Sequence, residues 1–155
     1  MIRIEETVHV DRSPEEAFAF LADFRNLPRW DPGIVVSEKT DGPDSVGVGT
    51  GFEVVASFLG RRIPMTYRVT VHDPVARRAV LVGRAATLTA TDDIEVVAAP
   101  GGSRVRWRAD SAFVGPLRFT EPLMKPLMVR LGRDAMSGLV RALGGRRIPS
   151  PAAAL

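Results

Sequence analysis

The sequence of 155 residues contains no cysteine, and its only lysines are Lys39 and Lys125. Without cysteine the chain can form no disulfide, no thiolate nucleophile and no cysteine-ligated zinc site. No apolar run approaches the roughly 20 residues of a membrane-spanning helix. The N-terminal segment alternates apolar and polar residues, unlike a signal peptide. These absences predict a cytoplasmic protein with no integral membrane segment.

The positive charge of the chain is small and dispersed. The net charge is +3, and the sequence pI of about 10.1 arises because nearly all cationic residues are arginines, which stay charged to high pH. The arginines are scattered along the chain rather than gathered in one tract, which argues against a nucleic-acid partner. With 45% hydrophobic and 25% charged residues, the composition is that of one globular domain.

The N-terminal part predicts a strand followed by two short helices. Residues 2–10 alternate apolar and polar side chains, as a half-buried strand does. Ser13, Pro14 and Glu16 are typical of a helix start, with Ser13 as the cap and Glu16 closing a capping box. Residues 25–32 then predict a compact turn or a second short helix.

The rest of the chain predicts an antiparallel meander and one long helix. Short gaps separate the predicted strands, which favours hairpins. The last helix, residues 123–143, ends at two glycines, and Pro126 either lies in its first turn or kinks it. The predicted fold is therefore α+β, with one sheet face in water and the other on the long helix. The predicted strands after the first are residues 33–40, 48–58, 63–72, 78–86, 89–98 and 103–114.

Hairpin register predicts which side chains face inward. Because side chains alternate between the two faces of a strand, the orientation of one residue fixes that of all the others. The pairs predicted around Gly60 are apolar and define the inner face: Phe58 with Ile63, Ala56 with Met65, Val54 with Tyr67 and Phe52 with Val69. The same register places Glu53 opposite Arg68 on the outer face. Around Gly101, Asp93 and Glu95 also face outward, beside a stripe of arginines: Arg104, Arg106 and Arg108.

The last helix is apolar over more than the arc that a surface helix needs. Two interpretations stay open, plain core packing or the lining of a ligand space, and its methionines suit a pocket that accepts varied apolar ligands. A second apolar stripe on this helix could instead contact a membrane surface or a partner protein. That stripe comprises Val129, Met136, Val140 and Leu143.

Several stretches together resemble a known family: residues 8–18, 23–30, 47–50, 71–78 and 101–105. The chain resembles the polyketide cyclase/dehydrase and lipid-transport family of the START-like (SRPBCC, Bet v 1-like) superfamily over residues 3–144. The resemblance implies one helix-grip domain over residues 1–145 and a flexible tail over residues 146–155. In this fold a curved seven-stranded antiparallel sheet grips the long C-terminal helix around an apolar cavity.

The resemblance also implies which residues face that cavity. Trp30 matches the family's tryptophan near the cavity mouth. The sheet would contribute Phe52, Val54, Tyr67, Val69, Leu81, Ile94, Trp107 and Ala109. The helix would contribute Met124, Leu127, Met128 and Leu131.

Recognisable catalytic motifs are absent. The glycines of residues 47–51 approach a dinucleotide fingerprint, but Phe52 replaces the third glycine and a strand follows instead of a helix. His9 and His72 lie at outward positions without a third ligand, so neither a metal nor a cofactor is predicted. No pattern indicates an oligomeric state.

Three polar residues are candidates for cavity chemistry: Glu6, Tyr67 and Asp92. A carboxyl group in an apolar cavity has a raised pKa and can act as a general acid or base. The alternatives are that Glu6 and Asp92 lie at wet strand ends and that Tyr67 is core. The leading hypothesis is the non-catalytic binding, or transport, of a hydrophobic small molecule such as a lipid, isoprenoid or polyketide. The alternative is a cyclase or dehydratase that uses these three groups.

Overall fold

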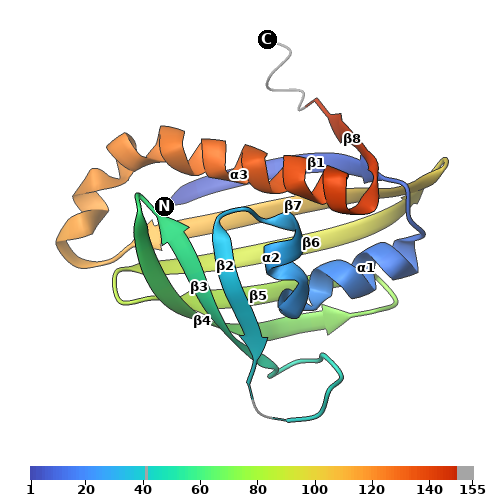
Figure 1. Ribbon diagram of the computed structural model, residues 1–155, viewed down its shortest axis with the longest axis horizontal. Helices are drawn as coiled ribbons and strands as arrows, with labels where there is room; N and C mark the ends of the chain where they lie inside the picture. The colour runs from blue at the N-terminus through green and yellow to red at the C-terminus, as the bar shows by residue number, and fades with distance from the viewer. Residues whose placement is uncertain (41, 150–155) are drawn as a thin grey trace.

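The computed structural model describes residues 1–40 and 42–149, and an antiparallel sheet curves around one long helix (Figure 1). The chain belongs to the α+β class, with a strand, short helices, a meander and a long helix in that order. The strands are β1 (Ile2–Val10), β2 (Ile34–Lys39), β3 (Gly51–Phe58), β4 (Arg61–Asp73), β5 (Arg78–Arg84), β6 (Leu88–Ala99), β7 (Gly102–Phe113) and β8 (Gly145–Ile148). The helices are α1 (Pro14–Ala22), α2 (Leu27–Trp30) and α3 (Glu121–Leu143), with 3₁₀ turns η1 (Phe24–Asn26) and η2 (Gly115–Thr120).

The sheet contains eight strands in the described part of the chain, not the predicted seven. Their order is β2-β3-β4-β5-β6-β7-β1-β8, and every neighbouring pair is antiparallel. The additional strand, β8, lies in the segment predicted as a flexible tail, where Val10 pairs with Gly145 and Thr7 with Ile148. Gly144 and Gly145 have positive φ angles, which turn the chain from α3 back onto β1. Residues 150–155 of the predicted tail lie outside the described residues.

The β3–β4 hairpin has the predicted faces but a different register. Phe58 pairs with Arg61 around a two-residue turn, so Phe52 lies opposite Tyr67 and Glu53 opposite Thr66. The prediction placed each partner two residues further along β4 because it assumed a four-residue connection. Since side chains alternate with a period of two, a two-residue shift preserves the inner face.

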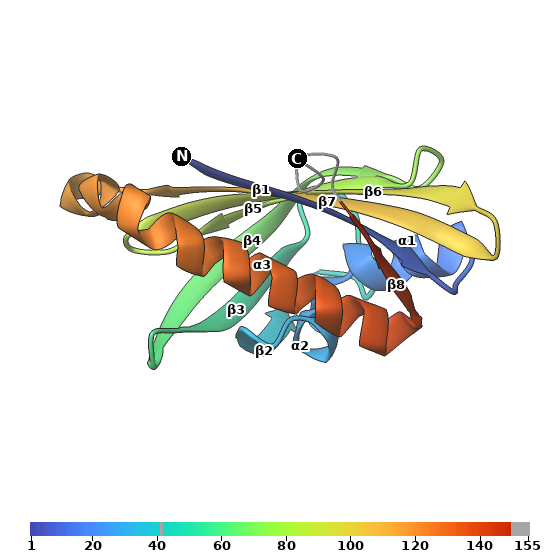
Figure 2. The same ribbon diagram turned by 90° about the horizontal axis from the view of Figure 1, so that it is seen from above.

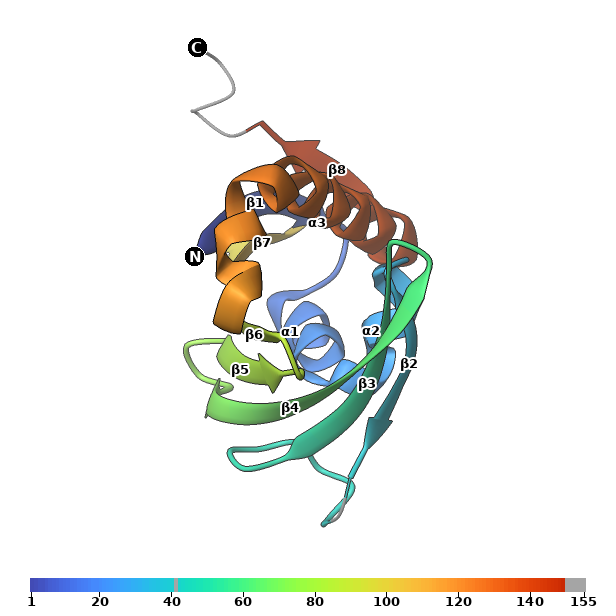
Figure 3. The same ribbon diagram turned by 90° about the vertical axis from the view of Figure 1, so that its left-hand side faces the viewer.

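Helix α1 begins at the predicted cap, Ser13. The Ser13 hydroxyl accepts the Glu16 backbone N–H at 3.2 Å, and Pro14 occupies the first turn of α1. Helix α3 begins at Glu121, two residues before the predicted start, with Pro122 in its first turn and Pro126 inside the helix. Figures 2 and 3 show α3 crossing the concave side of the sheet, with α1 and α2 on that same side.

The proposed second apolar stripe of α3 is not available to a membrane or a partner. Met136 is fully buried and Leu143 is 8% exposed, while Val129 and Val140 pack against the core. The prediction failed because α3 packs against β1, β8 and α2, so more than one side of the helix is covered.

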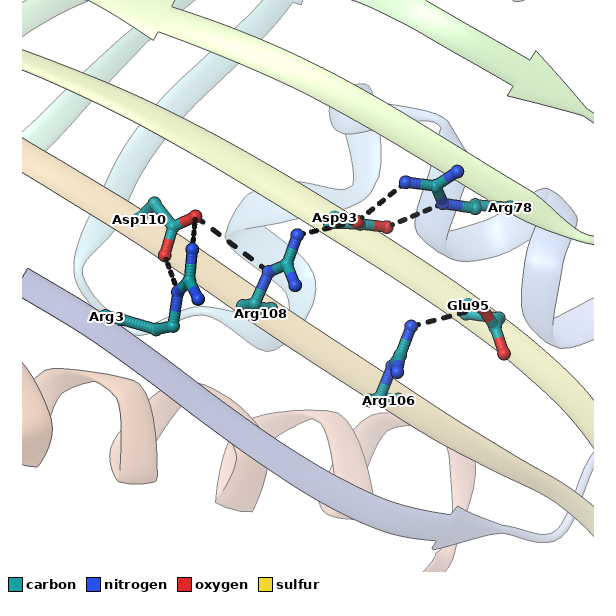
Figure 4. Close-up of polar contacts among 7 residues, drawn as sticks. All are labelled: Arg3, Arg78, Asp93, Glu95, Arg106, Arg108 and Asp110. Carbon is teal, nitrogen blue, oxygen red and sulfur yellow. Dashed lines mark hydrogen bonds and ion pairs between the residues drawn. The ribbon is translucent and has the colours of Figure 1, made fainter.

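Charged side chains on the outer face form ion pairs between strands (Figure 4). Arg78 donates to both oxygens of Asp93 at 3.1 and 3.0 Å, and Arg108 reaches the same carboxylate at 3.3 Å. Arg3 pairs with Asp110 at 2.7 Å, and Arg106 pairs with Glu95 at 3.2 Å. This network accounts for much of the arginine stripe as cross-strand pairing on the outer face.

Candidate functional site

A cavity of about 170 Å³ lies between the sheet and α3. An apolar cavity of about 150 Å³ is large enough to hold benzene, so this space can hold a small ring system. Its lining is mostly apolar. The lining residues are Ile4, Asp31, Gly33, Ile34, Ala56, Ser57, Phe58, Ile63, Met65, Tyr67, Thr87, Leu88, Ala90, Asp92, Trp107, Ala109, Ser111, Phe113, Met128, Leu131, Gly132 and Ala135.

Small side chains leave this space open. On the strands the inward positions next to it carry Ala56, Ala90 and Ala109, and α3 presents Gly132 and Ala135 one turn apart. Elsewhere the concave face is filled by large side chains, including Phe52, Leu81 and Ile94, each at most 1% exposed. The cavity therefore results from side-chain size at particular positions, since the inner face as a whole is apolar.

A buried polar group lies in the wall of the cavity. The Trp107 indole Nε1 donates a hydrogen bond of 2.8 Å to Oδ1 of Asp92. Asp92 also interacts with the Tyr67 hydroxyl from β4. All three residues are nearly buried, at 7–8% exposure. The sheet therefore holds a carboxyl group, a phenol and an indole together in an apolar space.

A glycine on the strand between them allows Tyr67 to approach Asp92. Gly83 of β5 lies opposite Tyr67, and Leu81 of the same strand lies opposite Asp92. A Cβ atom at Gly83 would lie only 2.5 Å from the tyrosine ring, so any side chain there would displace it. The ring of Phe24 holds the other side, with its centroid 5.2 Å from that of Tyr67 in an edge-on arrangement.

Asp31 adds a second carboxyl group to the cavity lining. It directly follows α2, and its Oδ1 accepts the backbone N–H of Gly33 at 2.8 Å. Burial raises the pKa of Asp31 to about 6, although the Gly33 hydrogen bond opposes the shift and the charge of Asp134 on α3 adds to it. The sequence predicted a compact turn or a second short helix over residues 25–32, but it did not indicate that Asp31 faces the cavity.

The pKa of Asp92 is also raised to about 6, mainly by burial. The hydrogen bonds from Trp107 and Tyr67 oppose this shift, while the negative charge of Asp31 adds to it. Burial, reinforced by the charge of Asp92, raises the pKa of Tyr67 well above its usual value. At neutral pH the site therefore contains a neutral phenol and two carboxyl groups that titrate unusually close to neutrality.

Five of the thirteen residues expected to face a ligand line this cavity: Tyr67, Trp107, Ala109, Met128 and Leu131. Six others lie in the closely packed core and do not line it: Trp30, Phe52, Val54, Val69, Leu81 and Ile94. They face inward, but larger side chains and the short helices fill the space beside them. Met124 and Leu127 are half-buried on the first turns of α3 and are not part of the lining either.

The three candidates for cavity chemistry separate in the structure. Tyr67 and Asp92 line the cavity. Glu6 does not, because its carboxylate accepts a 2.9 Å hydrogen bond from Arg147 of β8. Glu6 lies opposite Trp107 and therefore on the predicted inner side of the sheet. Strand β8, which was not predicted, supplies the arginine that pairs with it.

Most of the cavity lining could not be predicted from alternation along the strands, because alternation identifies a face of the sheet and not the space above that face. The signal that could have found it was the run of small residues at inward positions: Ala90, Ala109 and Ser111 on neighbouring strands, and Gly132 and Ala135 on the helix.

The sequence profile described as "Polyketide cyclase / dehydrase and lipid transport" matches residues 1–144. The chain belongs to this family. An uncharacterized protein of Mycobacterium tuberculosis is 28% identical over 128 residues, which cover 79% of this chain and 72% of that protein. No helix among the described residues of this family member is long and apolar enough to cross a membrane.

Solved structures share the fold at low sequence identity. The ZhuI aromatase/cyclase from a Streptomyces species aligns with a TM-score of 0.71 and 12% identity, covering 91% of this chain and 90% of that one. A START superfamily protein from Mycobacterium smegmatis aligns with a TM-score of 0.68 and 16% identity, covering 91% and 93%. These likenesses establish the START-like helix-grip architecture of the chain.

Proposed function

We propose that this protein binds a hydrophobic small molecule in the cavity between the sheet and α3. The observation that carries the proposal is the cavity of about 170 Å³ with a mostly apolar lining and a few polar groups in its wall. Small-molecule sites have this composition, in which apolar walls provide affinity and isolated polar groups fix orientation. Membership of a family described by cyclases, dehydrases and lipid transport supports the same reading.

The size of the cavity favours a compact ligand. Sites for drug-sized molecules usually enclose about 300–1,000 Å³, which exceeds the volume here. One or two fused rings would fit without rearrangement, whereas an entire acyl chain would need movement of α3 or the β3–β4 hairpin. The proposed ligand is accordingly a small isoprenoid or aromatic polyketide fragment, not a long-chain lipid.

Calorimetric titration with naphthalen-2-ylmethanol, a compact neutral probe, tests the proposal. Ala90 lines the cavity, so Ala90→Leu fills part of it, and we expect binding to weaken at least about tenfold because the probe and the new side chain compete for one space. Ala98→Leu is the matched control, since Ala98 is exposed on the same strand. Absence of binding by the unmodified protein, or equal loss in both variants, would contradict the proposal.

A second candidate function, proton transfer on a bound carbonyl compound, is favoured by one observation. Asp92 and Tyr67 interact inside the cavity, and Asp92 has a pKa of about 6. A carboxylate with this pKa can remove a proton from a carbon next to a carbonyl group near neutral pH, and the neutral phenol can donate to the resulting enolate. Cyclisation and dehydration of a poly-β-keto chain both need such a step.

Incubation with a poly-β-keto thioester analogue, followed by mass spectrometry of the products, tests this candidate. If it is correct, Asp92→Asn reduces the rate at least about a hundredfold, the usual contribution of a general base. Retained binding of naphthalen-2-ylmethanol by the variant would show that the cavity is intact. Turnover that is equal in Asp92→Asn and the unmodified protein would exclude this role for Asp92.

A further inference from the structure

The charges inside the cavity are all of one sign. Asp31 and Asp92 both line it, and no lysine, arginine or histidine occurs among the described residues of the lining. Arg3, Arg78, Arg106 and Arg108 point to the outer face, where they pair with Asp93, Glu95 and Asp110 (Figure 4). Neither cavity carboxylate has an ion pair with a basic side chain in the described part of the chain.

Aromatic rings line the same space. Phe58, Tyr67, Trp107 and Phe113 contribute to the cavity wall from β3, β4 and β7. The face of an aromatic ring attracts a cation, and the attraction grows when water is excluded. This second feature is independent of the carboxyl groups, and both favour positive charge in the bound molecule.

We propose that the cavity selects apolar molecules that carry a protonated amine and excludes those that carry a carboxylate. The inference rests on the proposed binding function and specifies its ligand class. The ammonium group of such a ligand would lie beside Asp92 and Asp31 and balance their negative charge. The hydrocarbon part of the ligand would occupy the space lined by Ala56, Ala90 and Ala109. A carboxylate would bring a third negative charge into a poorly solvated space, where like charges repel strongly.

Three probes with one ring system test this selectivity: naphthalen-2-ylmethylamine, naphthalen-2-ylmethanol and naphthalene-2-carboxylate. Near pH 8 we expect calorimetry to show the amine binding at least about tenfold more tightly than the alcohol, and the carboxylate at least about tenfold more weakly. If the alcohol binds but the amine is no tighter, the selectivity is wrong while the binding function stands. If none of the three binds, both are wrong.

Conservative variants locate the selectivity. Asp92→Asn keeps an oxygen that can accept the Trp107 hydrogen bond, so we expect this contact to survive and the preference for the amine over the alcohol to fall about tenfold. Asp31→Asn should act in the same direction. Glu95→Gln on the outer face of β6 is the matched control, and its amine preference should be unchanged. An unchanged preference in both cavity variants would overturn the proposal.

A pH series gives a further check. The groups that influence Asp92 are Asp31, Asp110, Trp107 and Tyr67, and those that influence Asp31 are Gly33 and Asp134, so none of these neighbours within residues 1–40 and 42–149 is a basic side chain. A primary alkylamine stays protonated below about pH 9. Amine affinity should therefore fall about tenfold between about pH 7 and pH 5 as the carboxylates take up protons, while alcohol affinity changes little. Equal pH dependence of the two probes would contradict the inference.

Discussion

Asp92 and Asp93 are adjacent on β6, yet their environments shift their pKa values in opposite directions. Asp92 faces the cavity, and burial raises its pKa to about 6. Asp93 faces outward, and its hydrogen bonds with Arg78, followed by the charge of Arg108, lower its pKa. The alternation of a strand therefore separates a carboxyl group suited to binding and proton transfer from one that joins neighbouring strands.

The raised pKa of Asp92 implies a stability cost that depends on pH. In the unfolded chain an aspartate titrates near its ordinary pKa of about 3.9. Between about pH 4 and pH 6 the folded protein thus binds more protons at this site than the unfolded chain does. The contribution of Asp92 to the free energy of unfolding consequently falls as pH rises through this range and is lowest above it.

We predict that Asp92→Asn raises the free energy of unfolding by about 1–3 kcal/mol near pH 8 and has little effect near pH 4. Asn removes the buried charge and retains an acceptor for Trp107. Urea titrations of both proteins at the two pH values provide the measurement. If the difference in unfolding free energy between the two proteins is the same at pH 4 and pH 8, burial of the Asp92 charge does not destabilise the fold.

At the level of elements, the β3–β4 hairpin contains a residue that its turn does not favour. Leu59 and Gly60 both have positive φ angles, as a two-residue type I′ turn requires, and Leu59 is 69% exposed. A leucine at such a φ is costly, and its side chain gains little from packing in this position.

Leu59→Asn should therefore stabilise the protein by about 0.5–1 kcal/mol, because asparagine tolerates the left-handed conformation. Thermal or urea unfolding would measure the change. Val75→Asn, at an even more exposed turn position without a positive φ, is the control and should have a smaller effect. If Leu59→Asn destabilises the protein, the leucine side chain makes stabilising contacts despite its high exposure.

The contact between α3 and α2 depends on a glycine in the helix. A Cβ atom at Gly138 would collide with the backbone carbonyl of Trp30, whereas one at Gly132 would meet mainly the Ile4 and Trp107 side chains. Backbone cannot move aside as a side-chain tip can.

Gly138→Ala should consequently cost about 2–3 kcal/mol of unfolding free energy, and Gly132→Ala should cost less. Both changes gain the same helix propensity, so their difference isolates the collision with α2. Chemical denaturation of the pair gives the comparison. A Gly138 variant as stable as the Gly132 variant would mean that α2 can shift at little cost.

The order of elements and the inner face of the sheet could be predicted from the sequence, whereas the site could not be predicted completely. Period-two alternation identifies Tyr67 and Asp92 as inward, and the capping residues at Ser13 locate α1. Asp31 comes from a short irregular segment without periodicity, so its position depends on tertiary packing. The same holds for β8, whose four residues form a strand because β1 offers a free edge.

At the level of the whole molecule, the cavity is a packing defect that should respond to pressure. Unfolding eliminates internal void volume, so proteins with larger voids unfold at lower pressure. Ala90→Leu reduces this void without changing the exposed surface, because Ala90 is buried in the cavity wall.

We predict that Ala90→Leu raises the pressure midpoint of unfolding relative to Ala98→Leu, which adds the same side chain on the surface. Tryptophan fluorescence under hydrostatic pressure would report the transition, since Trp107 lies in the cavity wall. Identical pressure midpoints would indicate that the space is already occupied or collapses readily.

Both borders of the curved sheet are poor templates for another strand. On one border β8 is only four residues long and carries Arg146 and Arg147, and on the other β2 is interrupted by a bulge between Ile34 and Val36. A short, charged or irregular border discourages the addition of a foreign strand. The two edges of the sheet thus disfavour backbone hydrogen bonding between strands of neighbouring copies of this chain.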